Sequence, residues 1–235
     1  TKVNKMIDVA AGSHYVESLT ADLVRQSWAL FLQVVEMSPE LQESYLMELA
    51  QDVQSSRIEV LAKRKASLIG TNMYANPDDT VSSSVSNEST ERLAIPFEQL
   101  RKHFEDNQLK TAVVSFGVLK EVKPRADFVQ GFLQAGGLNP IMSPVFTEAN
   151  DAWHWVKSNQ IDYAVVAAKD EVTKEILPLF LKQTDNQIII DVAGKFAEEK
   201  QWQQLGLHGA IFAGQDLIKK MHQLIQVEKE GVQGI

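Results

Sequence analysis

Catalytic or metal-binding chemistry in this chain would have to use histidine, acidic or hydroxyl side chains, because the chain contains no cysteine. The absence of cysteine excludes disulfides, thiolate nucleophiles and Cys-ligated zinc or iron–sulfur clusters. No two histidines are spaced like metal ligands, so we expect each of them to be structural or exposed. The five are His14, His103, His154, His208 and His222.

The other candidate side chains give little support to catalysis. Asp191 stands alone near the end of an apolar stretch, and we expect it to have a strand-end or capping role. The chain has no G-x-S-x-G sequence, which would mark a serine nucleophile. The basic run Lys63-Arg64-Lys65 is short in an acidic chain and predicts a solvated helix end. Trp153 and Trp155 have helical spacing, which predicts that one packs inward and the other lies on a flank.

From Glu91 onward, short apolar segments alternate with helical ones. The apolar segments are rich in β-branched residues, which is typical of strands buried on both faces of a parallel sheet. Five strands and five helices predict an α/β fold with a doubly wound, five-stranded parallel sheet of flavodoxin-like (Rossmann-like) type. The predicted strands are Thr111–Phe116, Pro140–Val145, Tyr163–Ala167, Gln187–Val192 and Ala210–Ala213, and the predicted helices are Pro124–Ala135, Ala149–Asn159, Asp170–Gln183, Ala197–Leu205 and Gln215–Val227.

A doubly wound sheet binds ligands beyond the carboxyl ends of its strands. The loop after the first predicted strand, Gly117–Pro124, has one glycine followed by bulky residues. It matches neither the G-x-G-x-x-G turn of dinucleotide sites nor the G-x-x-x-x-G-K-[ST] loop of nucleoside triphosphate sites. It also lacks the paired acidic residues with which a receiver domain holds magnesium. The sequence therefore disfavours nucleotide binding and phosphoacceptor chemistry at this loop.

The region before the α/β domain is predicted to be helical. Thr20 is expected to cap one helix, and Ser38-Pro39 is expected to begin a second helix that stops near Gly70. Such a hairpin is too small to bury its own large apolar residues, so we expect it to pack against something else. The stretch after it is rich in Ser and Thr and is predicted to be a solvated linker. The expected organisation is a helical region over 1–75, a linker over 76–90 and an α/β domain over 91–235.

Charge and hydropathy exclude several classes of partner. The chain has 23 Lys and Arg against 31 Asp and Glu, a formal net charge of −8 that is spread along its length. It lacks the basic field of a protein that binds nucleic acid or an anionic membrane. No apolar run approaches the roughly 18 residues of a membrane span, and no signal peptide is visible. At 235 residues, we expect a soluble, cytoplasmic protein of one large or two small domains.

Four strings in the chain carry a resemblance to one family. They are Ala10–Thr20 (AAGSHYVESLT), Ile69–Pro77 (IGTNMYANP), Arg92–Arg101 (RLAIPFEQLR) and Phe132–Gly137 (FLQAGG), in that order. Together they resemble the C-terminal part of methylmalonyl-CoA mutase, over nearly the whole chain and least in the linker. The resemblance implies that residues 1–75 are the helical end of a truncated TIM barrel and that most of the barrel, with its substrate pocket, is missing before Thr1.

The same resemblance implies where a cofactor would lie. The family binds cobalamin through a D-x-H-x-x-G motif after the first strand, an S-x-L after the third and a glycine pair after the fourth. A carboxylate replaces imidazole poorly as a cobalt ligand, and a proline fixes φ where a glycine allows close approach. We therefore expect no cofactor-binding, catalytic or metal-binding residue in this chain. The degenerate positions are Leu119, Glu121 and Pro124 in the first motif, Ala167 and Lys169 in the second, and Gly194 in the third.

Bacterial forms of this enzyme can be heterodimers, and the chain resembles their small (beta) subunit. The resemblance implies a structural, partner-stabilising role beside a large catalytic subunit. That holoenzyme uses adenosylcobalamin to interconvert methylmalonyl-CoA and succinyl-CoA. Two alternatives stay open: a subunit that binds cobalamin in a non-standard mode, and a stand-alone flavodoxin-like binding or signalling module. A homodimer of the chain is also open.

Overall fold

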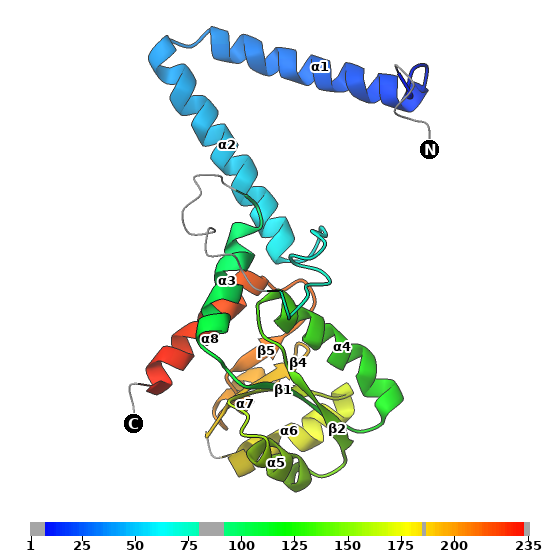
Figure 1. Cartoon of the computed structure of the whole chain (residues 1–235), viewed down its shortest axis with the longest axis vertical. Helices are drawn as coiled ribbons and strands as arrows, with labels where there is room; N and C mark the ends of the chain where they lie inside the picture. Colours follow the sequence, from blue (N-terminus) through cyan, green and yellow to red (C-terminus); the bar gives the residue numbers. More distant parts are fainter. Residues whose placement is uncertain (1–7, 80–91, 185–186, 233–235) are drawn as a thin grey trace. The chain divides into compact units, whose positions relative to one another are not determined.

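The computed structural model describes residues 8–79, 92–184 and 187–232. The chain divides into two compact units, Thr1–Ser56 and Arg57–Ile235 (Figure 1). Most of the predicted linker, residues 80–90, lies outside the described residues. No helix in the described ranges is both long enough and apolar enough to cross a membrane.

Two long helices account for most of the first unit. Helix α1 (His14–Val35) starts six residues before Thr20, so the predicted cap at Thr20 is wrong; Ser13 is extended and precedes the helix instead. Helix α2 (Pro39–Ala62) starts at Pro39 as predicted. It ends before Gly70 because Arg64 takes the left-handed conformation, with φ 55°, and Lys65 N–H closes the last turn on the Val60 carbonyl.

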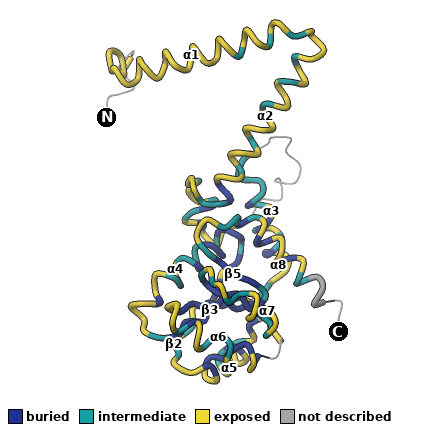
Figure 2. Tube along the Cα trace, turned by 180° about the vertical axis from the view of Figure 1, so that it is seen from behind, coloured by how far each residue is buried: buried dark blue, intermediate teal, exposed yellow. Residues whose placement is uncertain are grey.

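None of the described residues of the first unit is buried. Figure 2 colours most of α1 as exposed, and α2 is exposed or half-exposed up to Ser56. The apolar side chains exposed on α1 include Tyr15, Leu19, Leu23, Val24, Trp28, Phe31, Leu32 and Val35. These helices bury no core of their own, as the sequence predicted.

A five-stranded sheet forms the centre of the second unit, and all of its strands are parallel, in the order β2-β1-β3-β4-β5. This confirms the predicted doubly wound α/β fold. Strands β1 and β3 match their predicted bounds, and the other three differ by one or two residues at their ends. The strands are β1 (Thr111–Phe116), β2 (Ile141–Phe146), β3 (Tyr163–Ala167), β4 (Ile189–Ala193) and β5 (Gly209–Ile211).

Helices cover both faces of the sheet and give it two apolar cores. One face packs against α3 (Ile95–Asp106), α4 (Leu119–Ala135) and α8 (Leu217–Val232). The other packs against α5 (Ala149–Ser158), α6 (Asp170–Thr184) and α7 (Glu199–Gln203) (Figure 1). Helix α3 was not predicted. Its Phe97, Leu100 and Phe104 are buried at helical spacing.

The segment between α2 and the linker packs on the α/β domain. Asn72 is fully buried and holds the segment's turns, since it donates to the carbonyls of Leu61 and Ala66. Arg64 lies 5.7 Å above the Phe128 ring of α4 and donates to the Met73 sulfur, so the prediction of a solvated basic run is wrong for Arg64. The left-handed turn at Arg64 directs this side chain onto α4 instead of into solvent.

Candidate functional site

The strand order predicts that a ligand crevice would lie between the loops that follow β1 and β3. From β1 the chain moves to β2 on one side and to β3 on the other, so the order reverses at β1. In open α/β sheets, ligands bind at such a reversal, beyond the carboxyl ends of the strands. Gly117, with φ 105°, turns the chain out of β1, and Ala168 and Lys169 lead it out of β3. All six predicted motif positions lie near these ends or at the end of β4.

The three positions of the first motif lie on a helix. Helix α4 begins at Leu119, five residues before its predicted start, so Leu119, Glu121 and Pro124 are helical. Pro124 cannot donate the backbone hydrogen bond that residue 120 would accept, which is why the sequence predicted a later start. Leu119 is 62% exposed and offers no polar atom, and the Glu121 carboxylate lies 3.9 Å from the Lys169 ammonium.

Side chains of α4 bridge the crevice to the loop after β3. Ala167 is buried at the end of β3, and Lys169 is exposed between Glu121 and Glu171. Arg125 donates to the Ala168 carbonyl and, at 2.7 Å, to the Asp170 carboxylate. These contacts connect the two loops between which a ligand of this fold would lie.

The space above Gly194 is filled. Gly194 follows β4 with φ 121°, and a Cβ built there would lie 2.9 Å from Cε2 of Phe196 and 3.7 Å from Cζ of Arg125. The family's glycine pair makes room for a nucleotide tail at this point, whereas here an aromatic ring and a guanidinium occupy that room. A ligand that approached Gly194 would therefore meet the Phe196 ring and the Arg125 guanidinium.

Sequence reasoning missed the two side chains that fill the crevice, Arg125 and Phe196. Arg125 contacts residues more than forty positions later, and nothing in its sequence neighbourhood indicates these partners. Phe196 is two residues beyond Gly194, and a bulky residue so close to a glycine that should admit a ligand was an available signal.

Asp191 is not alone, so the expectation of an isolated strand-end carboxylate is wrong. It is fully buried in β4 and accepts hydrogen bonds from the Tyr163 hydroxyl at 2.6 Å and from Nδ1 of His208 at 3.0 Å. The Lys220 ammonium, on α8, lies 2.5 Å from Oδ2 of the same carboxylate. We call Tyr163, Asp191, His208 and Lys220 the buried tetrad.

The charge state of the buried tetrad follows from these contacts. Burial alone would raise the pKa of Asp191, but the charge of Lys220 and the hydrogen bond from His208 outweigh it and lower that pKa to about 2. Burial raises the pKa of the Tyr163 phenol well above its usual value, so this group stays protonated and donates. Asp191 is therefore ionised and Lys220 balances its charge.

The other four histidines and the two tryptophans of α5 lie outside the buried tetrad. His14, His154 and His222 are exposed, as expected, and Nε2 of His103 lies 3.3 Å from the Glu228 carboxylate. Trp153 is buried and Trp155 half-buried, which confirms the prediction for this pair. Within the described ranges, no three His, Asp or Glu side chains gather into a group that could hold a metal ion.

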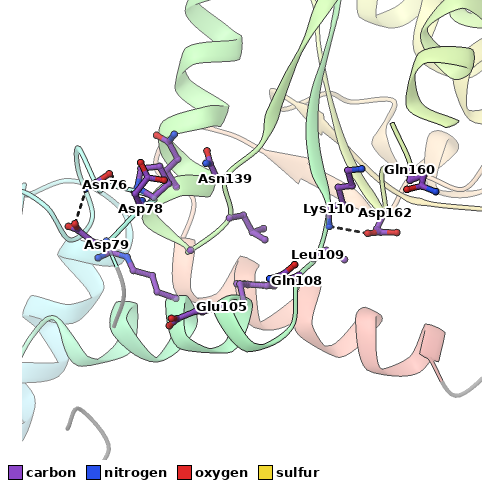
Figure 3. Close-up of a pocket in the computed structure, with 16 residues that line it drawn as sticks. Asn76, Asp78, Asp79, Glu105, Gln108, Leu109, Lys110, Asn139, Gln160 and Asp162 are labelled. Carbon is purple, nitrogen blue, oxygen red and sulfur yellow. Dashed lines mark hydrogen bonds between the residues drawn. The ribbon is translucent and has the colours of Figure 1, made fainter. Parts of the chain in front are cut away.

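Two cavities lie away from the crevice, one at the amino ends of the strands and one beside the edge strand β5. The larger, of about 810 Å³, lies before β1, β2 and β3 and contains an excess of carboxylates, including Asp78, Asp79 and Glu105. Figure 3 shows hydrogen bonds among its polar groups, with the Lys110 amide donating to Asp162 at 3.0 Å. The smaller cavity, of about 430 Å³, lies between α7, β5 and α8, beside the buried tetrad.

The family model and the curated relatives that match this chain all concern the same enzyme. The sequence model of a family described as methylmalonyl-CoA mutase matches residues 1–135. The chain is 26% identical over 196 residues to the methylmalonyl-CoA mutase small subunit of Porphyromonas gingivalis, an alignment that covers 74% of this chain and 32% of the relative. It is 28% identical over 154 residues to probable small subunits of the same enzyme from Mycobacterium bovis and Mycobacterium tuberculosis, covering 59% of this chain and 24% of each relative. The chain thus spans between a quarter and a third of the length of these curated relatives.

Proposed function

The chain belongs to the methylmalonyl-CoA mutase family, and from this premise we propose that it is part of a non-catalytic small subunit that stabilises a large catalytic partner and does not itself bind cobalamin. The observation that carries the proposal is the crevice, which Arg125 bridges and which Arg125 and Phe196 fill above Gly194. Glu121 stands where the imidazole that ligates cobalt would be needed, and Leu119 stands where the carboxylate that orients this imidazole would be needed. Methylmalonyl-CoA isomerisation and adenosylcobalamin then belong to the holoenzyme.

The exposed apolar side of α1 supports the partner-stabilising part of the proposal. Large side chains such as Leu23, Trp28 and Phe31 are about half exposed or more, although apolar side chains of this size are normally buried. Many large exposed apolar side chains on one helix favour an interface at that helix. We propose the large subunit as its occupant, with a homodimer as the alternative assembly.

The proposal also covers the domains and the setting. Residues 1–75 are taken as the helical end of a barrel, 76–90 as a linker and 91–235 as a cobalamin-binding-type domain that has lost its ligand. Residues 57–75 nevertheless pack with the α/β domain in the second compact unit. A cytoplasmic location is part of the proposal, and the net charge of −8 supports partners other than nucleic acid or membranes.

Cofactor binding is tested by titrating hydroxocobalamin and adenosylcobalamin into the full chain while recording the visible spectrum. We expect no saturable change in the cobalt absorption bands. A saturable change would contradict the proposal, and loss of that change in Glu121→Ala would then assign the binding to a carboxylate-ligated mode.

The partner is tested by co-purification with a candidate large subunit, comparing Leu23→Asp with Ala29→Asp. Helical geometry places Ala29 away from the apolar side that carries Leu23 and Phe31, so both variants add one charge to α1 but only one adds it to that side. We expect Leu23→Asp to reduce co-purification and Ala29→Asp to retain it. Equal retention by both variants would remove α1 from the interface. A chain that never co-purifies with a large subunit would favour the stand-alone module.

A further inference from the structure

The buried tetrad fixes one histidine tautomer. The Asp191 carboxylate can only accept hydrogen bonds, so the His208 nitrogen that lies 3.0 Å from it, Nδ1, must carry the proton. In the neutral ring, Nε2 then holds a lone pair. Lys220 lies 3.5 Å from Nδ1 and is the cation that balances the charge of Asp191. His208 therefore presents an oriented acceptor.

The orientation of His208 is held by packing. The Lys220 side chain is 3% exposed, and its ammonium passes so close to Gly209 that a Cβ there would lie 3.1 Å from Nζ. The same Cβ would lie 3.4 Å from the Asp191 carboxylate, so a side chain at position 209 would press on the ion pair. A carboxylate that binds one imidazole nitrogen in this way orients the other nitrogen toward a ligand.

The smaller cavity lies where that second nitrogen is available. His208 is 21% exposed and lines the cavity, and no described side chain is bonded to its Nε2. The volume of about 430 Å³ falls within the range of small-molecule sites. The other polar side chains that line it include Glu199 and the amides of Gln203, Gln223 and Gln226.

The lining selects the class of ligand. Nε2 of His208 and the carboxylate of Glu199 are acceptors, and the amides offer both donors and acceptors. Lys220 also lines the cavity, but its side chain is 3% exposed and its ammonium is paired with Asp191. An anion would therefore meet two acceptors, one of them charged, whereas a hydroxyl group can donate to either of them and accept from the amides. The apolar side chains of Phe212 and Val227 complete the wall. We infer that this cavity binds a small, neutral, polyhydroxylated molecule, such as a sugar or a cyclic polyol, with one hydroxyl donating to Nε2 of His208.

The test uses the full chain and long-range ¹H–¹⁵N NMR of its histidine rings, with D-ribose, D-glucose and myo-inositol as polyol probes and acetate and inorganic phosphate as anion probes. We expect at least one polyol to shift the Nε2 resonance of His208 in a saturable way and both anions to leave it unchanged. A saturable shift with an anion, or none with any polyol, overturns the inference.

Variants separate binding from folding. His208→Ala should weaken polyol binding by about threefold to tenfold, as expected for one lost hydrogen bond, while the matched control His154→Ala on α5 should retain it. Gln223→Trp places a large ring in the cavity and leaves all four residues of the buried tetrad unchanged, so it should abolish binding even if His208→Ala perturbs the fold. Undiminished binding in Gln223→Trp would place the polyol elsewhere and overturn the inference.

Discussion

At the scale of residues, the buried tetrad joins four separate parts of the second unit. Its donors come from the start of β3, from the residue before β5 and from α8, and they meet at a carboxylate in β4. Because Asp191 and Lys220 are both removed from water, each depends on the other for charge compensation. Such a pair adds little to the free energy of unfolding compared with apolar side chains of the same shape. Removing one partner, however, leaves a buried charge unpaired and is costly.

We predict that Asp191→Asn destabilises the protein far more than the same change at the surface. A neutral amide at this position would leave the Lys220 ammonium without a counter-charge, and we expect a loss of about 3 kcal/mol in the free energy of unfolding. The matched control is Asp127→Asn, which breaks the exposed pair with Lys123 and should cost less than about 1 kcal/mol. Urea unfolding measures both, and losses of similar size would contradict this account of the buried pair.

The lowered pKa of the same carboxylate predicts that the protein loses stability in acid. The pKa of Asp191 is lowered from its usual 3.8 to about 2 in the folded state, so the ionised form favours folding above pH 3.8. As the pH falls from about 4 to about 2, this contribution of about 2 kcal/mol is lost. Urea unfolding across that range should show this loss in the wild type and a flatter profile in Asp191→Asn. Parallel profiles for the two proteins would contradict the assignment.

The sequence contained part of the signal for the tetrad. An aspartate inside the apolar run of β4 must be buried, and a buried carboxylate needs a partner. Lys220 lies among Leu217, Met221 and Leu224, on the side of α8 that helical spacing places toward the sheet. The ion pair between Asp191 and Lys220 could therefore have been predicted from the sequence. Tyr163 and His208 could not, because only the parallel register of β3, β4 and β5 brings them to Asp191.

At the scale of elements, the central strands were predictable and the edges less so. Strands β1 and β3 are buried at every residue, so their apolar runs have sharp ends. Strand β2 is half-exposed at the sheet edge and contains Pro144, and its pairing with β1 is irregular. There, Ser115 N–H donates to the Ser143 hydroxyl instead of to a strand carbonyl. Proline is tolerated at such an edge, but it weakens the sequence pattern by which a strand is predicted.

Glycines near the end of α4 give a prediction with an internal control. Gly137 has φ 99°, and a Cβ there would lie 2.6 Å from Cα of Arg101, so Gly137→Ala should reduce the free energy of unfolding by about 2 kcal/mol or more. Gly131 lies within the same helix, where a Cβ would make only an ordinary contact at 3.7 Å with Arg64. Gly131→Ala should therefore raise stability by about 0.5–1 kcal/mol through helix propensity. Thermal or urea unfolding measures both, and a stable Gly137→Ala protein would contradict the packing of α4 on α3.

At the scale of the whole molecule, burial is distributed very unequally along the chain. Every buried apolar residue among those described lies between Leu61 and Ile225. The described part of the first unit has long helices and large exposed apolar side chains but no core. Most helical stability in proteins comes from packing an apolar side, and within their own unit α1 and the first part of α2 lack such packing.

This distribution predicts that a chain beginning at Arg57 keeps the stability of the second unit. We expect its urea unfolding to remain cooperative and its free energy of unfolding to stay within about 1 kcal/mol of the main transition of the full chain. It should also bind less of a dye such as ANS, because the exposed apolar side of α1 is removed.

A second variant shows that this comparison can detect a real loss. Leu61→Ala in the chain from Arg57 removes a buried side chain just after the boundary between the units, and it should cost about 2–5 kcal/mol. Deletion of residues 1–56 could reduce the free energy of unfolding as much as Leu61→Ala does. In that case the first unit stabilises the second, and our account of the first unit as a surface that adds nothing to the core is wrong. If only Leu61→Ala is costly, the first unit is free to pack its apolar side against a partner without loss to the α/β domain.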